Sequence, residues 1–218
     1  MQETTLTPEQ NEIQLTDKQI FTKIWTSPRM VFKYINDNNY DKYVKILLVL
    51  AGIARAFDRA MMKDRGDDSS LLFIILSSII IGGLLGWLTY YIYSGLISLT
   101  GDWLGGQGNT HSILRVFSYA LIPSIIALLI IVPQISVYGI ELFKSNGNYD
   151  GSDLIKYILL YGGVVMETIL GLWTIVLVVI AISEVQKISI GYAILNLLLP
   201  ILFIVVPIIL IVFISSMF

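Results

Sequence analysis

Three residues could do chemistry within or beside membrane-spanning segments: Glu167, Asn196 and Arg115. Glu167 is the only charge in the apolar run 157–183, and at 1.5 Å per residue it lies about 15 Å from the near end of that run. A carboxylate at this depth is costly unless it is neutralised, paired or hydrated. These residues are therefore a candidate intramembrane polar site, either a buried acid that joins two helices or a proton or ion relay.

Other signals for catalysis are weak. The chain has one histidine, His111, and no cysteine, which excludes disulfides, thiol chemistry and Cys/His zinc sites. The loop 101–109 contains four glycines, but no strand precedes it and no Lys-Ser/Thr pair follows, so it is not a P-loop. No nucleophile–base pair and no metal-ligand cluster is visible. The sequence predicts a protein that is not an enzyme and has no catalytic residue, cofactor or metal.

The composition predicts an integral membrane protein. Apolar residues make up 56% of the 218 residues and charged residues only 14%, whereas soluble domains carry about 25% charged residues. The net charge of −2 gives no basic surface for nucleic acid. No cleavable signal peptide is recognisable in the first 40 residues.

The long apolar runs predict an all-α, polytopic helix bundle over residues 41–218. Four runs exceed the roughly 20 residues that cross a bilayer. A fifth segment, 43–63, is short and contains Arg55, Asp58 and Arg59, so it either lies at the interface or spans with its charges near a boundary. The five predicted helices are 43–63, 70–98, 113–142, 154–183 and 188–216.

The basic residues predict the orientation. Ten of the 14 Lys and Arg residues precede residue 66, so the positive-inside rule places the N-terminus in the cytoplasm. Charge alone favours four spans with 43–63 at the interface, because a fifth crossing would divide the basic residues almost evenly between the two sides.

The N-terminal region combines a polar tail with amphipathic helices. Residues 1–16 are predicted to be disordered. Within 17–40, apolar residues recur at helical spacing over 18–25 and 28–36, and Ser27-Pro28 separates the two helices. Such helices suit the lipid headgroup layer, and a cap packed on the protein itself is the alternative. The predicted interface residues are Phe21, Trp25, Arg29, Phe32 and Lys33.

Small residues at four-residue spacing mark predicted helix-packing faces. Ser78, Gly82 and Gly86 form one stripe, and Gly163 and Gly171 flank Glu167 in another. In lipid, such stripes let helix backbones approach closely. Packing within the chain is favoured over a homodimer face.

Four short motifs resemble those of a known family in their order and spacing. They are IWTSPR at 24–29, AGIARAFDRA at 51–60, FSYALIP at 117–123 and AISEVQKIS at 181–189. Together they resemble the bacterial branch of the Yip1-domain family. The resemblance implies five membrane helices, a cytoplasmic N-terminal region and a place in the bacterial inner membrane. It favours counting 43–63 as a fifth, short crossing. The Asp-Leu-x-Gly-Pro motif of eukaryotic members is missing, so small GTPase partners are not supported.

The resemblance implies a non-enzymatic protein that organises the membrane or binds partner proteins as a scaffold. Two alternatives remain open: a small transporter or channel that uses kinked helices and Glu167, and an accessory subunit of a membrane complex. The expected partners are the lipid bilayer and either a second copy of the chain or other membrane proteins, with no nucleic acid.

Overall fold

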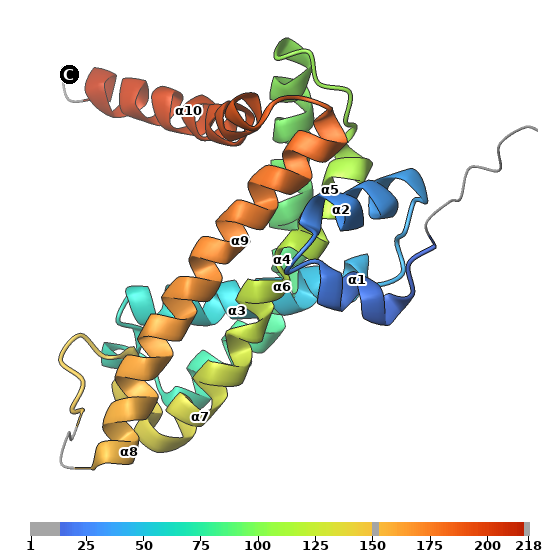
Figure 1. Cartoon of the computed structure of the whole chain (residues 1–218). Coiled ribbons are helices and arrows are strands. Elements are labelled where there is room, and N and C mark those ends of the chain that lie inside the picture. The colour runs from blue at the N-terminus through green and yellow to red at the C-terminus, as the bar shows by residue number, and fades with distance from the viewer. Residues whose placement is uncertain (1–13, 150–152, 216–218) are drawn as a thin grey trace, which may run out of the picture.

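The computed structural model describes residues 14–149 and 153–215, and these contain helices and no strand. The predicted disordered tail lies mostly outside the described residues. The longer helices are α1 (Asp17–Lys23), α2 (Pro28–Asp37), α3 (Val44–Met62), α4 (Leu71–Trp103), α5 (Thr110–Ala120), α7 (Leu128–Tyr138), α9 (Gly163–Gln186) and α10 (Ile190–Ser215). In Figure 1, α9 runs diagonally through the molecule and α10 leaves its upper end at a steep angle.

The two N-terminal helices begin where local chemistry predicts. Thr16 and Gln19 form a capping box at the start of α1, and Pro28 occupies the first turn of α2. Their apolar faces pack on the protein itself, and α2 contacts α5 and α9. Phe32 is completely buried, so its predicted place at the membrane interface is wrong. Phe21 and Trp25 are half-buried, and Arg29 and Lys33 remain exposed.

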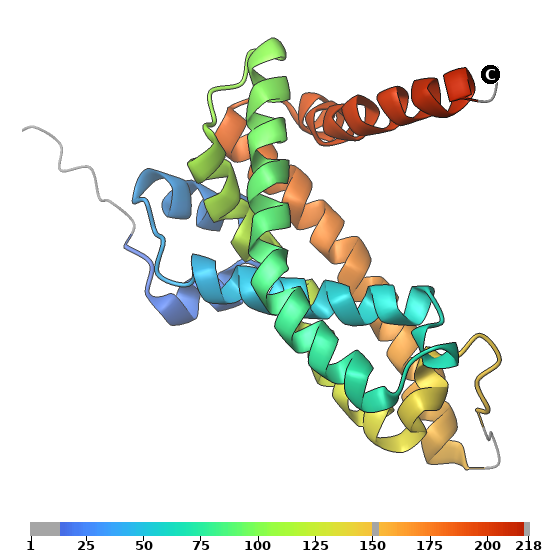
Figure 2. The same ribbon diagram turned by 180° about the vertical axis from the view of Figure 1, so that it is seen from behind.

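The α3 and α4 helices cross closely because small residues meet at the crossing (Figure 2). A side chain on Gly52 of α3 would collide with the backbone of Gly82 and Gly86, and one on Gly82 would collide with Ala56. The stripe of Ser78, Gly82 and Gly86 therefore faces α3 of the same chain, as the sequence favoured. At its C-terminal end, α4 continues to Trp103, five residues beyond the predicted limit.

The predicted helix 113–142 is divided into shorter helices. After α5, the short α6 (Ile122–Ile126) has Pro123 in its first turn, and α7 contains Pro133 before a 3₁₀ turn at Gly139–Phe143. Proline lacks the amide that donates to the preceding turn, so a straight, uninterrupted helix is disfavoured here. The helix is interrupted at Leu121, and both α5 and α6 pack against α9.

The predicted helix 154–183 begins with α8 (Leu154–Tyr157) and a π-helical turn at Ile158–Gly162, then continues as α9 to Gln186. Gly163 packs against Gln134 of α7. A side chain on Gly171 would meet no atom within 4 Å, so Gly171 makes no close helix contact within the described part of this chain, and a role in a homodimer face stays a prediction. Only one of the two glycines that flank Glu167 marks a tight contact.

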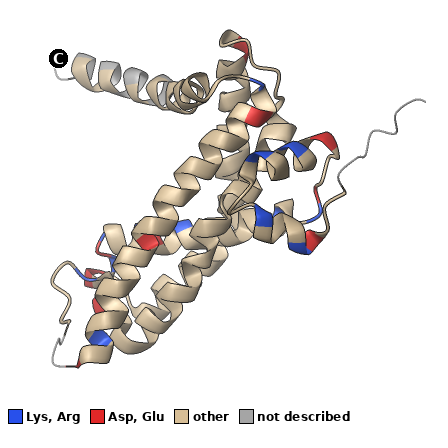
Figure 3. Ribbon diagram, in the orientation of Figure 1, with Lys and Arg blue, Asp and Glu red and all other residues tan. Residues whose placement is uncertain are grey.

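Three helical stretches are long and apolar enough to cross a membrane within residues 14–149 and 153–215: Leu71–Trp103, Ile122–Phe143 and Leu154–Gln186. The first part of α10, Ile190–Leu202, is a shorter apolar helix, and α3 is not among the candidate spans. Figure 3 shows charged residues gathered around α1 and α2 and near the turns beside α8, with few along α9. The chain is thus a multi-helix membrane protein, and a count of five crossings stays a prediction.

Candidate functional site

The largest group of buried polar side chains lies where α4, α9 and α10 meet. Gln186, at the last position of α9, is completely buried. Its Oε1 accepts a hydrogen bond from the amide of Gly108 at 2.8 Å, and its Nε2 donates to the Ile97 carbonyl and to Asn196 Oδ1, both at 3.3 Å. We call Gln186, Asn196, Thr100 and the loop 101–109 the Gln186 cluster.

Asn196 joins α10 to α4 in this cluster. Its Nδ2 donates to the Ile97 carbonyl at 3.0 Å and to Thr100 Oγ1 at 2.8 Å. The sequence singled out Asn196 but missed Gln186 and Thr100. A buried side-chain amide is costly unless it forms hydrogen bonds, and the Asn196 amide forms them with other residues of the protein. Asn196 is therefore a connection between helices and not a partner of Glu167.

The glycine-rich loop is explained by Gln186. Side chains on Gly101 or Gly106 would collide with the Gln186 amide, and Gly105 has a φ of 78°. Glycine is the residue that allows such close approach and such a backbone. Four glycines in nine residues were the sequence signal for this contact. Because the segment is not a P-loop, its glycines indicate that another group, here the buried Gln186 side chain, packs closely against its backbone.

Arg115 pairs with Asp41 at the start of the α3 segment. The guanidinium donates from Nε to Oδ1 at 2.7 Å and from a terminal nitrogen to Oδ2 at 3.2 Å. His111 Nε2 lies 3.5 Å from the same carboxylate. The Arg115 guanidinium beside Asp41 holds the pKa of that carboxyl below its usual range. This two-bond ion pair holds α5 against the loop before α3. Arg115, a candidate for the intramembrane polar site, is therefore paired with Asp41 instead.

A second charged group holds α1 in place. Asp17 accepts hydrogen bonds from Lys42, from the Tyr40 hydroxyl at 2.6 Å and from the Tyr43 hydroxyl. These donors, Lys42 first, hold the pKa of Asp17 well below its usual range. The N-terminal helices are thus attached to the bundle by polar contacts as well as by their apolar faces.

Glu167 lies apart from both groups. Its Oε1 is buried with no hydrogen-bond partner in the part of the chain that the structure describes. Together with Asp58 of α3 it lines a small cavity of about 10 Å³, whose other walls are Ala54, Ala127, Leu128 and Ile131. A cavity of this size holds about one water at most. The prediction that Glu167 shares one polar site with Asn196 is wrong, and the neighbour that the sequence missed is another carboxyl group, Asp58.

The three candidate residues therefore do not form one site. Arg115 bonds to Asp41, Asn196 bonds to Gln186 and Thr100, and Glu167 faces Asp58. Among residues 14–149 and 153–215, no group of three His, Asp or Glu side chains could hold a metal ion. The polar side chains of Arg115 and Asn196 form hydrogen bonds with other residues of the protein, and these bonds connect different helices and loops.

The long apolar helices, joined by polar contacts near their ends, define a multi-pass helical membrane protein. The family model of the Yip1 domain matches residues 22–213. The chain belongs to the Yip1 family. No curated protein and no solved structure matches it significantly.

Proposed function

We propose that this protein is a non-enzymatic scaffold that organises the membrane or holds partner proteins within it. Membership of the Yip1 family supports this proposal. The observation that carries it is the small cavity beside Glu167, because room for about one water leaves no wide aqueous path to this carboxyl group in this conformation.

Transport is the main competing function. A transporter needs a hydrated path to its intramembrane charge, usually built from broken helices around the binding site. Here Pro123 and Pro133 interrupt one segment, but Glu167 lies in a contact between α9, α3 and the α6–α7 region. A larger cavity, between α3 and α4, is not lined by Glu167. The packing around Glu167 therefore favours the scaffold over the transporter.

The exposed surface supports contacts with lipid and with other membrane proteins. Large apolar side chains on α4 and α9 are more than half exposed, among them Leu84, Leu172 and Ile175. Arg29 and Lys33 remain exposed on α2, and each basic residue near an anionic leaflet contributes about 1 kcal/mol. We propose that α2 faces the cytoplasm and that the bundle lies in the bacterial inner membrane.

The deciding experiment is recovery of the full chain from membranes in mild detergent after brief cross-linking. A scaffold should retain a membrane protein, or a second copy of itself, at a fixed ratio, and Glu167→Gln should retain it equally well because Gln preserves shape. A fixed ratio that persists without cross-linking, within one larger complex, would favour the accessory subunit. Proton or ion flux in proteoliposomes that Glu167→Gln abolishes would contradict the scaffold and establish transport.

A further inference from the structure

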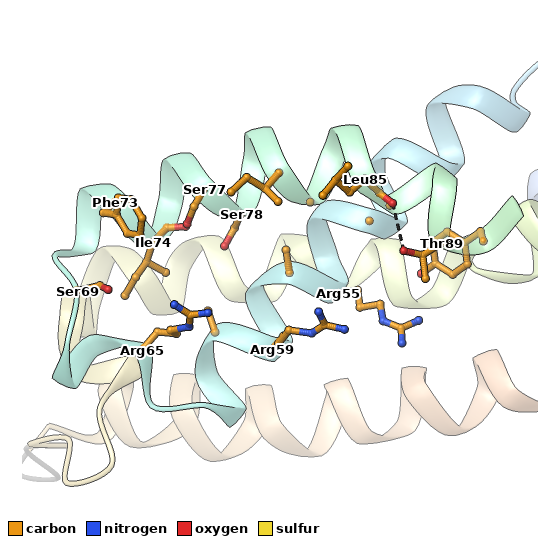
Figure 4. A pocket seen from close by; sticks show the side chains of 17 residues that line it. Arg55, Arg59, Arg65, Ser69, Phe73, Ile74, Ser77, Ser78, Leu85 and Thr89 are labelled. Carbon is orange, nitrogen blue, oxygen red and sulfur yellow. Dashed lines mark hydrogen bonds between the residues drawn. The ribbon is translucent and has the colours of Figure 1, made fainter. Parts of the chain in front are cut away.

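A cavity of about 360 Å³ lies between α3 and α4, and one of its walls is strongly basic. Arg55 and Arg59 contribute to this wall from α3, and Arg65 follows from the 3₁₀ turn Arg65–Asp67. Figure 4 shows the three side chains in a row along one side of the cavity, with Ser77 and Ser78 across from them on α4. We call these residues the arginine cavity.

The three guanidinium groups form no close ion pair, within 4.0 Å, with an acidic side chain of the part of the chain that the structure describes. Asp58 is the acidic group on the same helix whose charge acts on Arg55, but Asp58 lines the other cavity, beside Glu167. Like charges four residues apart on a helix repel. An anion in the cavity would remove that repulsion.

The opposite wall offers hydroxyl groups. The Ser77 and Thr89 hydroxyls donate to carbonyls of their own helix, those of Ile74 and Leu85. The Ser78 side chain also lines the cavity, and no hydrogen bond joins it to another described residue. A hydroxyl donor facing three guanidinium groups is a donor set suited to phosphoryl oxygens, since arginine binds phosphate through paired hydrogen bonds.

The rim of the cavity is apolar. Phe73, Ile81 and Leu85 line it, and each is more than half exposed. All three lie on α4, in a candidate membrane span. A ligand at this position therefore meets cations on one side and hydrocarbon on the other, which is the chemistry of a phospholipid. The volume suits a headgroup and the start of its acyl chains.

We propose that the arginine cavity binds the phosphoryl headgroup of an anionic phospholipid, with its acyl chains along Phe73, Ile81 and Leu85. Gly52, Gly82 and Gly86 help to line the cavity as well as the helix crossing, so the backbone contact that joins α3 to α4 also forms part of this site. The site stands apart from the proposed scaffold function, because it would exist whether or not the protein holds a partner.

The test measures lipid binding by the purified full-length protein. Native mass spectrometry of the detergent-solubilised chain is titrated with phosphatidylglycerol, with phosphatidylcholine and with inorganic phosphate in separate arms. Wild type should bind one phosphatidylglycerol more tightly than phosphatidylcholine, and phosphate should compete only weakly. Arg59→Gln with Arg65→Gln should weaken phosphatidylglycerol binding about tenfold or more, because two guanidinium contacts to the phosphoryl oxygens are lost.

Control variants separate this site from general attraction. Arg29→Gln removes the same charge from exposed α2, outside the cavity, and should change binding less than about twofold. If the double variant does not fold, Arg65→Gln alone is measured instead, because Arg65 lies in an exposed turn. This single variant should still weaken binding severalfold. Equal weakening by Arg29→Gln, or wild-type binding by the Arg65 and double variants, overturns the proposal. If inorganic phosphate competes fully with phosphatidylglycerol, the cavity binds free phosphate and not a lipid headgroup, and the proposal fails.

Discussion

The Arg115 guanidinium meets the Asp41 carboxylate at 2.7 Å, yet the two residues are not equally exposed. The Arg115 side chain is 5% exposed, whereas that of Asp41 is 47% exposed. The buried cation therefore depends on a half-exposed anion in the loop before α3. Losing the anion would leave a guanidinium buried without its partner, which costs more than the pair itself contributes.

We expect Asp41→Asn to lower the stability of the bundle by about 2 kcal/mol at pH 7, a value reduced for the exposure of the carboxylate. Because the pKa of Asp41 is lowered in the folded protein, its contribution is present above its ordinary value of 3.8 and is lost as pH falls through the lowered value. The difference between wild type and variant should shrink on acidification. Thermal unfolding followed by tryptophan fluorescence at pH 7 and pH 3 measures it. Asp37→Asn, an exposed site on α2, is the control, and an equal loss there would contradict the argument.

Gln186→Leu should destabilise the junction of α4, α9 and α10 by about 2–3 kcal/mol, because the Gly108 amide and Asn196 lose buried partners. The matched control is Gln107→Leu in the segment 101–109 that Gln186 contacts, because the Gln107 side chain is exposed. Protease cleavage of the loop 101–109 in the purified protein would report local opening. Cleavage that stays as slow in the Gln186 variant as in the control would show that the loop closes without this side chain.

Gly52→Ala should disrupt the α3–α4 crossing, because the added methyl would collide with the backbone of Gly82 and Gly86. We expect a lower melting temperature and reduced yield of monodisperse protein. Gly171→Ala carries the same chemical change at a position with open space, and helix propensity there favours alanine by up to about 1 kcal/mol. A Gly52 variant as stable as the Gly171 variant would contradict the packing argument.

Glu167→Gln should leave expression and thermal stability unchanged or slightly raised. Its buried Oε1 has no hydrogen-bond partner among the described residues, and the nearby Asp58 is also acidic, so removing the charge costs no contact. Melting curves of wild type and variant in the same detergent make the comparison. A marked drop in melting temperature would reveal an ionised Glu167 with a stabilising partner.

The number of crossings can be measured with reporters that are active on only one side of the membrane. If α3 crosses together with the four longer segments, a reporter after Phe218 should lie opposite to one at the N-terminus. Activity of both reporters in the cytoplasm would place α3 at the interface, as the charge distribution favours.

The class of protein and the positions of most helices can be predicted from the amino-acid sequence alone. Apolar run length and low charge identified the long segments, since hydrocarbon thickness sets a minimum length for any crossing. Proline and serine at 27–28 separated α1 from α2, and the observed bounds of α2, Pro28–Asp37, differ from the predicted 28–36 by one residue. Local propensity and hydropathy suffice for such features because they depend on neighbours in the chain.

Which polar groups meet depends on the packing of helices that are far apart in the sequence. Glu167 and Asn196 both lie in apolar runs, but Asn196 bonds to Thr100, a residue 96 positions away, while Glu167 faces Asp58. Phe32 lies in a pattern that suits a membrane surface equally well, yet it is buried against the bundle. An apolar face or a buried amide specifies that a partner is needed. The partner itself depends on how distant helices pack, and here the glycine contacts between α3 and α4 contribute to that packing.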